Sequence, residues 1–348
     1  MTAGAGVVSL PSPAALLAQV VRGDLVESEH LGHLVVLGPD GELRLAVGDP
    51  DATIWPRSSL KPVQAVAMLR AGLSLDDAGL SLACASHSGT PAHLDVVRRV
   101  LAAAGLTERD LQNTPDLPLD AGAAHAWRVA GRGPEPVTQN CSGKHAAMLA
   151  TCVAAGWDPT TYRDPDHPLQ RLVRQTVADL TGEPVHHVTV DGCGAPLLST
   201  TVRGLARAFG RVARTDGAAA GPDAGHLRAV ARAMSAHPEL VGGPERDVTR
   251  FMQAAPGLVA KDGAEGVYAA GLPDGTALAF KVADGGARPR PAVMAAALGV
   301  ALDVSARASG RVADRDVLAA VREVGRTPVL GHGEPVGEVR AVLATAEP

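Results

Sequence analysis

Two predicted β-hairpins, far apart along the chain, constrain the fold most. The first joins His33–Leu37 to Glu42–Val47 across a Pro-Asp-Gly turn, and the second lies within Gly266–Val282 around another Pro-Asp-Gly turn. Between the hairpins, apolar residues recur with helical spacing over Val63–Arg70, Ala92–Ala104, Ala146–Ala155, Leu169–Leu180, Ser199–Phe209 and Ala224–Ala236. Strands gathered toward both ends of the chain, with helices between them, predict an α+β fold around a largely antiparallel sheet.

The size of the chain allows a large core but leaves the number of domains open. Its 348 residues suit one two-lobed unit or two domains. Hydrophobic residues make up 46% of the chain and aromatic residues only 2%, so the core must consist mainly of Ala, Val and Leu. The run from Ala213 to Gly225, which contains Gly217-Ala218-Ala219-Ala220-Gly221-Pro222, is predicted to be a linker or a surface loop.

Charge and cysteine content exclude several classes of protein. A net charge of −5 and a pI near 6.2 provide no basic surface for nucleic acid or an anionic membrane. The Met1–Leu17 segment lacks the basic start of a signal peptide, and the apolar run Ala292–Leu302 is too short to cross a bilayer. Four cysteines are too few to stabilise a chain of this length with disulfide bonds, which favours free thiols or a metal site in a reducing compartment. We therefore expect a soluble, cytoplasmic protein.

Ser58 and Lys61, just before the first predicted helix, form the first candidate site. Their spacing places a hydroxyl and an amine on one face of a helical turn, where a neutral amine can take the hydroxyl proton. Penicillin-recognising serine hydrolases carry the same S-x-x-K pattern, together with S-D-N and K-T-G motifs that this chain lacks. Lys261-Asp262-Gly263 is only similar to K-T-G, and Pro62 disfavours helical geometry at Lys61. The alternative is an N-cap serine followed by a solvated lysine.

The second candidate site is the polar turn Ser86-His87-Ser88-Gly89-Thr90. It follows Leu80–Ala85, which is predicted to be a buried strand, and precedes the Ala92–Ala104 helix. Ser86, His87 and Ser88 offer a nucleophile or a proton relay, and backbone N–H groups at the helix start can hold an oxyanion or a substrate carboxylate. Alternatively, the turn only caps the helix, since capping uses the same atoms.

The third candidate site, Asn140–His145, combines a thiol, a hydroxyl, an amine and an imidazole around Gly143. Gly143 would let the backbone approach a ligand, and the Asn140 amide can both donate and accept hydrogen bonds. Lys144 lies in the first helical turn, where a cation opposes the helix dipole, so we expect a neutral or specifically paired amine. Alternatively, Asn140 caps the helix, Cys141 fills the core and Lys144 is solvated.

The fourth candidate site, Asp191–Pro196, follows the predicted strand His187–Val190. The Asp191 carboxylate could hold the ammonium group of a substrate. Cys141 and Cys193 could hold zinc together, but they lie far apart and neither belongs to a C-x-x-C pair. Spacing alone therefore argues against a zinc site, because structural zinc sites normally show clustered ligand pairs.

Taken together and in this order, these motifs resemble the L-asparaginase II family, the Rhizobium-type or thermolabile L-asparaginases. The resemblance runs through nearly the whole chain. The matching stretches are Val21-Arg22-Gly23, Glu27-Ser28, Gly48-Asp49, Arg57-Ser58, Lys61-Pro62-Val63-Gln64-Ala65, Ala85-Ser86-His87-Ser88-Gly89, Asn140–His145, His167-Pro168, Asp191–Pro196, Gly263-Ala264-Glu265-Gly266-Val267, Lys281-Val282 and Asp284-Gly285.

The resemblance implies a fold like that of serine β-lactamases and glutaminases, with an antiparallel sheet flanked by a helical lobe. Residues 1–348 would then form one catalytic unit with two lobes: a mixed α/β lobe from both termini and a helical middle. The implied activity is asparagine catabolism, in which the side-chain amide of L-asparagine is hydrolysed to L-aspartate and ammonia. A homodimer without an organic cofactor is also implied.

The resemblance also implies roles for individual residues. The catalytic groups would be Ser58 with Lys61 and a second pair, Ser86 with Lys144, and Ser88 is the competing choice for the second serine. Zinc would bind near the substrate to Cys141, Cys193 and Lys144, and a lysine can ligate a metal only as a neutral amine. Arg57 would hold the substrate carboxylate and Asp191 its ammonium group, and the remaining expected substrate contacts are His87, Ser88 and Asn140.

Two departures from the family pattern leave the substrate open. Thr90 stands where the family usually has glutamate, and Glu29 stands where arginine is common. The alternatives are a glutaminase, a β-lactam or peptide amidohydrolase on the same scaffold, or a non-catalytic protein that binds zinc or an amino acid.

Overall fold

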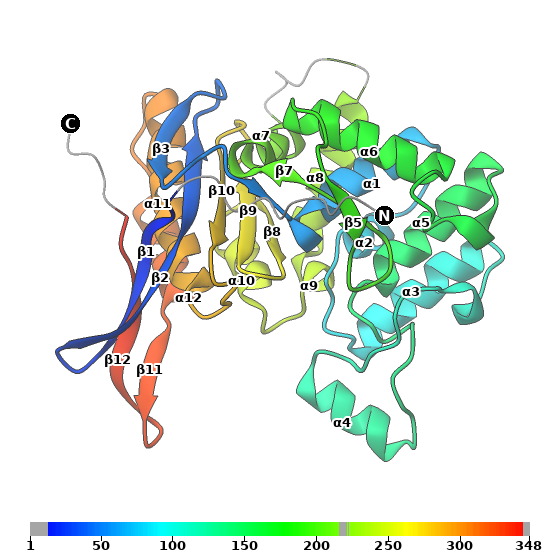
Figure 1. Ribbon diagram of the computed structural model, residues 1–348, viewed down its shortest axis with the longest axis horizontal. Coiled ribbons are helices and arrows are strands. Elements are labelled where there is room, and N and C mark those ends of the chain that lie inside the picture. Colours follow the sequence, from blue (N-terminus) through cyan, green and yellow to red (C-terminus); the bar gives the residue numbers. More distant parts are fainter. Residues whose placement is uncertain (1–12, 216–220, 222, 344–348) are drawn as a thin grey trace, which may run out of the picture.

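The computed structural model describes residues 13–215, 221 and 223–343. Of the predicted linker, Asp216–Ala220 and Pro222 lie outside the described residues, as does most of the Met1–Leu17 segment. The main sheet has the order β11-β12-β1-β2-β10-β9-β8, with β3 also paired to β2, and every pairing is antiparallel (Figure 1). Its strands are β1 (Ala15–Arg22), β2 (Leu25–Leu37), β3 (Leu43–Val47), β8 (Val259–Gly263), β9 (Val267–Gly271), β10 (Ala277–Val282), β11 (Pro328–Gly331) and β12 (Glu334–Ala341).

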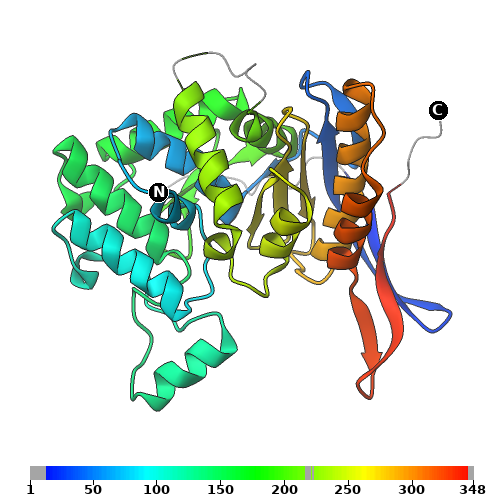
Figure 2. The ribbon, with the colours of Figure 1, turned by 180° about the vertical axis from the view of Figure 1, so that it is seen from behind.

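Both predicted hairpins are present in this sheet. Leu34 pairs with Val47 in the first, and Ala269 pairs with Ala279 in the second. All residues of β8 and β9 are buried. The helix α7 (Val202–Ala213) packs on one face of the sheet and α11 (Arg290–Ala308) on the other, where it contacts β9, whereas β8 is also covered by α10 (Asp247–Ala254) and η1 (Arg57–Leu60) (Figures 1 and 2). The α+β class and the antiparallel sheet are confirmed.

Helices between the two groups of strands form the second part of the molecule. The remaining α-helices are α1 (Lys61–Arg70), α2 (Asp77–Ala83), α3 (Pro91–Ala103), α4 (Ala121–Val129), α5 (Ser142–Ala155), α6 (Pro168–Thr181), α8 (Ala224–Ala236), α9 (Pro238–Val241), α10 (Asp247–Ala254) and α12 (Arg315–Gly325). The 3₁₀ helices are η1 (Arg57–Leu60), η2 (Glu108–Asp110) and η3 (Pro159–Thr161), and the short strands β4 (Thr53–Ile54), β5 (Val188–Val190), β6 (Pro196–Leu198) and β7 (Thr200–Thr201) pair as β4–β7 and β5–β6. The predicted helical middle is therefore present.

Two local predictions are wrong. Leu80–Ala85 is not a strand: α2 runs through Ala83, and the Asp76 carboxylate caps it by accepting from the Gly79 amide at 2.7 Å. A short buried apolar run has no periodicity that separates strand from helix. The helix predicted from Ser199 begins at Val202, because Thr201 ends β7 and its hydroxyl caps the helix.

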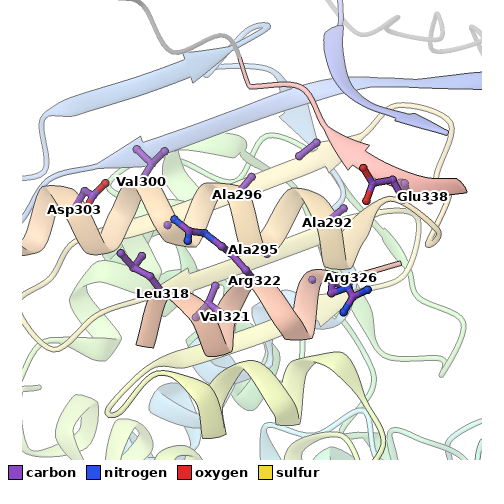
Figure 3. A pocket seen from close by; sticks show the side chains of 14 residues that line it. Ala292, Ala295, Ala296, Val300, Asp303, Leu318, Val321, Arg322, Arg326 and Glu338 are labelled. Carbon is purple, nitrogen blue, oxygen red and sulfur yellow. The ribbon is translucent and has the colours of Figure 1, made fainter. Parts of the chain in front are cut away.

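Helix α11 is longer than the apolar run Ala292–Leu302. Among the described residues, it is the one helix whose length and hydropathy would allow it to cross a membrane, a test that the core helices of soluble proteins also pass. Here α11 packs on the sheet and α12 packs on α11 (Figure 2). A groove between α11, α12 and β12 is lined by Ala296, Val300 and Arg322 among others, and none of its lining residues belongs to a candidate site (Figure 3).

Candidate active site

The S-x-x-K motif lies where η1 passes into α1. Arg57, which starts η1, has φ +53°, a left-handed conformation that costs energy in a non-glycine residue and is often found at functional sites. Lys61 is helical, with φ −58° and ψ −39°, although Pro62 follows it. The proline sits in the first turn of α1, where its missing N–H is not needed. The expected distortion by Pro62 is therefore absent.

The Lys61 amine connects three segments that lie far apart in the sequence. Lys61 is buried, and its Nζ donates to the Ser86 hydroxyl at 3.0 Å, to Cys141 Sγ at 3.1 Å and to the Ala85 carbonyl. The Lys61 backbone N–H donates to the Ser58 carbonyl within the helical turn, but no hydrogen bond among the described residues joins the Ser58 hydroxyl to the Lys61 amine. The hydroxyl that meets Lys61 is therefore that of Ser86, which was predicted to pair with Lys144.

Ser58 and Ser59 differ in their surroundings. The Ser58 side chain is half-buried and its hydroxyl makes no hydrogen bond to another described residue. The Ser59 side chain is buried, and its hydroxyl donates to the Lys261 carbonyl at 3.1 Å. Ser58 is thus the more available of the two hydroxyls, and Ser59 ties η1 to β8.

The two other polar side chains of the Ser86–Gly89 turn are bound by the protein itself. His87 is fully buried, its Nε2 lies 2.8 Å from the Ser142 hydroxyl, and its Nδ1 accepts from the Gly89 amide at 3.1 Å. Burial lowers the pKa of His87 well below its usual value, and the nearby His93 and Lys61 lower it further, so the ring is neutral. The Ser88 hydroxyl donates to the Gly242 carbonyl at 2.8 Å. Both side chains hold the turn in place.

A second polar cluster forms at the start of α5. The Lys144 Nζ lies 3.2 Å from Cys193 Sγ, and the Cys141 and Cys193 thiols are hydrogen-bonded to each other. The Cys141 hydrogen bond and the Lys144 charge lower the pKa of Cys193 to about 4, whereas the same hydrogen bond and burial raise the pKa of Cys141 to about 12. The pair therefore carries one thiolate near neutral pH.

The pKa of Lys144 is raised in the metal-free protein. Burial lowers it, but the charges of Cys193, Cys141 and Asp191 outweigh burial and raise the pKa above the ordinary lysine value. In the absence of a metal ion, Lys144 is an ammonium paired with the Cys193 thiolate. Of the expected alternatives, the specifically paired amine is the one observed.

The donor atoms of this cluster suit a zinc ion. Two sulfur atoms, one of them a thiolate, and one nitrogen lie together, and zinc favours sulfur and nitrogen ligands. The described residues contain no group of three or more His, Cys, Asp or Glu side chains that could hold a metal. A site here would therefore depend on Lys144 as its third ligand and on the loss of its proton.

Arg57 and Asp191 form an ion pair beside this cluster. The Arg57 Nε donates to Asp191 Oδ1 at 2.8 Å, and both side chains are mostly buried. Burial raises the pKa of Asp191, but the charges of Lys144 and Arg57 outweigh it and hold the pKa below the usual value. Nearby, Asn140 Oδ1 accepts from Gln139 Nε2 at 3.0 Å and from Cys141 Sγ at 3.2 Å, and no described residue pairs with its amide nitrogen.

Gly143 serves packing and not ligand approach. A Cβ at this position would lie 2.6 Å from the Leu82 side chain and 2.6 Å from the Leu82 carbonyl. Glycine therefore lets α5 approach α2 closely, which sets the position of Cys141 and Lys144 relative to the Ser86 turn.

Lys261 is a buried amine that no sequence motif had identified as a candidate site residue. It lies in β8, the last strand of the sheet, and β8 packs so closely on η1 that a Cβ on Gly263 would be 2.7 Å from the Pro56 carbonyl. Burial lowers the pKa of Lys261 to about 8, and the Lys61 charge contributes to this shift. The only signal in the sequence was the K-D-G triplet before the second hairpin.

Comparisons with known proteins agree with the resemblance seen in the motifs. The family model described as L-asparaginase II matches residues 18–341. No curated protein matches the chain significantly. Among solved structures, a β-lactamase from Mycobacterium bovis is 16% identical, with a TM-score of 0.44 over 84% of this chain and 96% of that one.

A protein called Mglu, solved in its native form, is 15% identical, with a TM-score of 0.41 over 84% of this chain and 63% of Mglu. Mglu in its glutamate form is also 15% identical, with a TM-score of 0.42 over 84% of this chain and 59% of Mglu. The chain thus covers less than two thirds of Mglu. A structural likeness at this level of identity and TM-score assigns no activity to this chain. The family model, in contrast, spans nearly the whole chain and therefore establishes the family. The chain belongs to the L-asparaginase II family.

Proposed function

We propose that this protein hydrolyses the side-chain amide of L-asparagine to L-aspartate and ammonia by serine–lysine chemistry. The observation that carries the proposal is the contact between the buried Lys61 amine and the buried Ser86 hydroxyl, which lie 3.0 Å apart. An activated nucleophile needs a base within hydrogen-bonding reach, and this geometry supplies one. Membership of the family supplies the substrate class.

The reaction would proceed through a covalent ester. A serine oxygen attacks the amide carbon, and its proton passes to Lys61 in the amine form, directly from Ser86 or from Ser58 by way of Ser86. Lys61 then gives this proton to the leaving nitrogen, the C–N bond breaks and ammonia departs. Water attacks the ester and passes its proton to Lys61 in the same way. Lys61 returns this proton to the serine oxygen as the ester C–O bond breaks, which releases L-aspartate and restores the serine hydroxyl and the amine.

Arg57 and Asp191 are suited to the two charges of an amino acid. The guanidinium would bind the α-carboxylate and the carboxylate would bind the α-ammonium, and their own ion pair keeps both groups in place in the free protein. Asn140, whose amide nitrogen has no partner among the described residues, would donate to the substrate. His87 and Ser88 would act indirectly, by holding the turn that carries Ser86.

Lys261 would provide the second amine in place of Lys144. It lies close enough to Lys61 that the two charges disfavour each other, and its pKa of about 8 leaves an appreciable uncharged fraction near neutral pH. When two neighbouring lysines carry only one positive charge between them, one of the two nitrogens is an uncharged amine that can act as a base. Lys144 would instead balance the Cys193 thiolate.

Cys141, Cys193 and Lys144 would hold zinc if the protein binds it. A bound zinc ion would supply a fixed positive charge close to the substrate site. Zinc would also replace the Lys144 proton as the partner of the thiolate.

An ammonia-release assay tests the proposal. L-Asparagine, L-glutamine and a β-lactam panel are compared, with and without added zinc or chelator. We expect release from L-asparagine, and its loss in Lys61→Met and Ser86→Ala but not in Ser309→Ala, a control in an exposed loop. Mass spectrometry of a quenched reaction would show whether Ser58 or Ser86 carries the ester.

Four outcomes would overturn this assignment. Release from L-glutamine alone would make the protein a glutaminase, and turnover confined to the β-lactams would place it with those hydrolases. If Ser58→Ala and Ser86→Ala both kept full turnover, the serine mechanism would be wrong. Calorimetric binding of L-asparagine without any hydrolysis would indicate a binding protein.

A further inference from the structure

Lysine is rare in this chain and is concentrated near the candidate site. The 32 basic residues include only four lysines, and the rest are arginine. Three of these lysines are buried: Lys61, Lys144 and Lys261. The first two contact the serine and the cysteines described above, whereas Lys261 is held by a different set of charges.

A single carboxylate, that of Asp262, holds the Lys261 amine. The Lys261 side chain folds back so that its Nζ donates to Asp262 Oδ1 at 2.6 Å and to the Asp262 carbonyl at 2.6 Å. The other carboxylate oxygen, Oδ2, accepts from Arg246 at 2.6 Å and lies 3.5 Å from an Arg290 nitrogen. One buried carboxylate therefore serves three cations.

The other titratable groups around this cluster are a thiol, a phenol, a second carboxyl group and the Lys61 amine. Burial raises the pKa of Cys84 to about 12, which leaves a neutral thiol. Burial and the charges of Asp247 and Asp262 raise the pKa of Tyr268 well above its usual value. Burial and the Asp262 charge also raise the pKa of Asp247. Lys61 adds a further positive charge.

We propose that Asp262 and Arg246 are positioning residues for Lys261: Asp262 fixes the amine beside η1, and Arg246 competes for the carboxylate so that the amine can give up its proton. Arg290 assists from the start of α11, and its Nη1 also donates to the Gly263 carbonyl at 3.1 Å. The inference rests on the proposed function in one respect, namely that an uncharged Lys261 is used in turnover.

The arrangement predicts opposite effects for the two positioning residues. The Asp262 charge raises the pKa of Lys261, and the Arg246 charge lowers it, although burial is the largest influence. Asp262→Asn should therefore lower the pKa of Lys261. Arg246→Gln should raise it, because the carboxylate then interacts more strongly with the amine. A residue with a purely structural role would not shift the pKa in opposite directions in the two variants.

Lysine NMR provides the direct test. Protein labelled with ¹³C at lysine Cε gives one signal for each of the four lysines, and Lys261→Arg identifies the signal of interest. We expect its titration midpoint to fall by about one pH unit or more in Asp262→Asn and to rise by a similar amount in Arg246→Gln. Arg203→Gln, which removes a partly exposed ion pair with Asp51, is the matched control and should leave the midpoint unchanged.

The outcomes separate this inference from the proposed function. If both variants move the midpoint in the same direction, or neither moves it, the inference is wrong. If Asp262→Asn does not fold, Arg246→Gln alone decides, because that arginine is partly exposed. If the midpoints move as expected but the pH profile of kcat/KM for L-asparagine does not follow them, the positioning role stands and the use of Lys261 in turnover is refuted.

Discussion

The contact between Lys144 and Cys193 gives the sharpest quantitative prediction. Lys144→Met keeps most of the side chain but removes the charge that lies 3.2 Å from Cys193 Sγ. At an effective dielectric constant of about 20, two unit charges at this distance attract by about 5 kcal/mol. That energy corresponds to a shift of roughly four pKa units. Because the hydrogen bond from Cys141 remains, we expect the pKa of Cys193 to rise from about 4 by at least about two units.

The assay is the ultraviolet absorbance of the thiolate as a function of pH, measured with a metal chelator present. Cys193 can be followed alone, because burial raises the pKa of Cys84 to about 12 and that of Cys152 to about 11, and the pKa of Cys141 is also about 12. Cys193→Ser provides the blank. Two results would refute the reasoning: a Lys144→Met protein that still titrates near pH 4, or a wild-type protein without a thiolate signal at neutral pH.

Three further predictions concern catalysis, packing and pH. Lys61→Met should lower kcat/KM for L-asparagine by about 10²–10⁴-fold, since it removes the base, and steady-state kinetics with near-normal values would contradict this. Gly143→Ala should lower the unfolding free energy by about 1–3 kcal/mol in urea titrations, because the new Cβ would meet the Leu82 backbone. In the control Gly299→Ala the Cβ has open space, so this change should be neutral or stabilising by up to about 1 kcal/mol. Equal effects of the two substitutions would contradict the prediction. Because the pKa of Lys261 is lowered from 10.5 to about 8, the unfolded state binds more protons than the native state between these values. The unfolding free energy of wild-type protein relative to Lys261→Met should therefore rise with pH in that window, and a flat difference would argue against the lowered pKa.

Much of the local structure could be predicted because its causes are local. Turn residues place the hairpins at β2–β3 and β9–β10, and helical periodicity matches α1, α3, α5, α6 and α8 to within a few residues at their ends. The exception is Leu80–Ala85. Every residue of this segment is buried, so its apolar residues show no spacing that would separate a helix from a strand. The capping of α2 by Asp76 was not predicted either.

The candidate site was predicted in its parts but not in its pairings. Ser58, Lys61, Ser86, Cys141, Lys144, Asp191 and Cys193 were all named from motifs, and the structure brings Lys61, Ser86 and Cys141 together and, beside them, Lys144 with Cys193. The expected pairs of Ser58 with Lys61 and of Ser86 with Lys144 are replaced by Lys61 with Ser86 and Lys144 with Cys193. A motif shows that an amine and a hydroxyl are present, but not which amine will reach which hydroxyl.

The amino-acid sequence by itself determined the hairpins, most of the helices and the family, because turn geometry, helical spacing and long motif matches depend on residues that are close in the chain. Only the tertiary structure decided that Lys61 meets Ser86 and Cys141, which lie 25 and 80 residues away, and that Lys261 is buried against Asp262. The close packing of α5 on α2 and of β8 on η1 sets these contacts. The same packing also decides which amines keep their protons, since a lysine pKa depends on burial and on charges that distant segments bring to it.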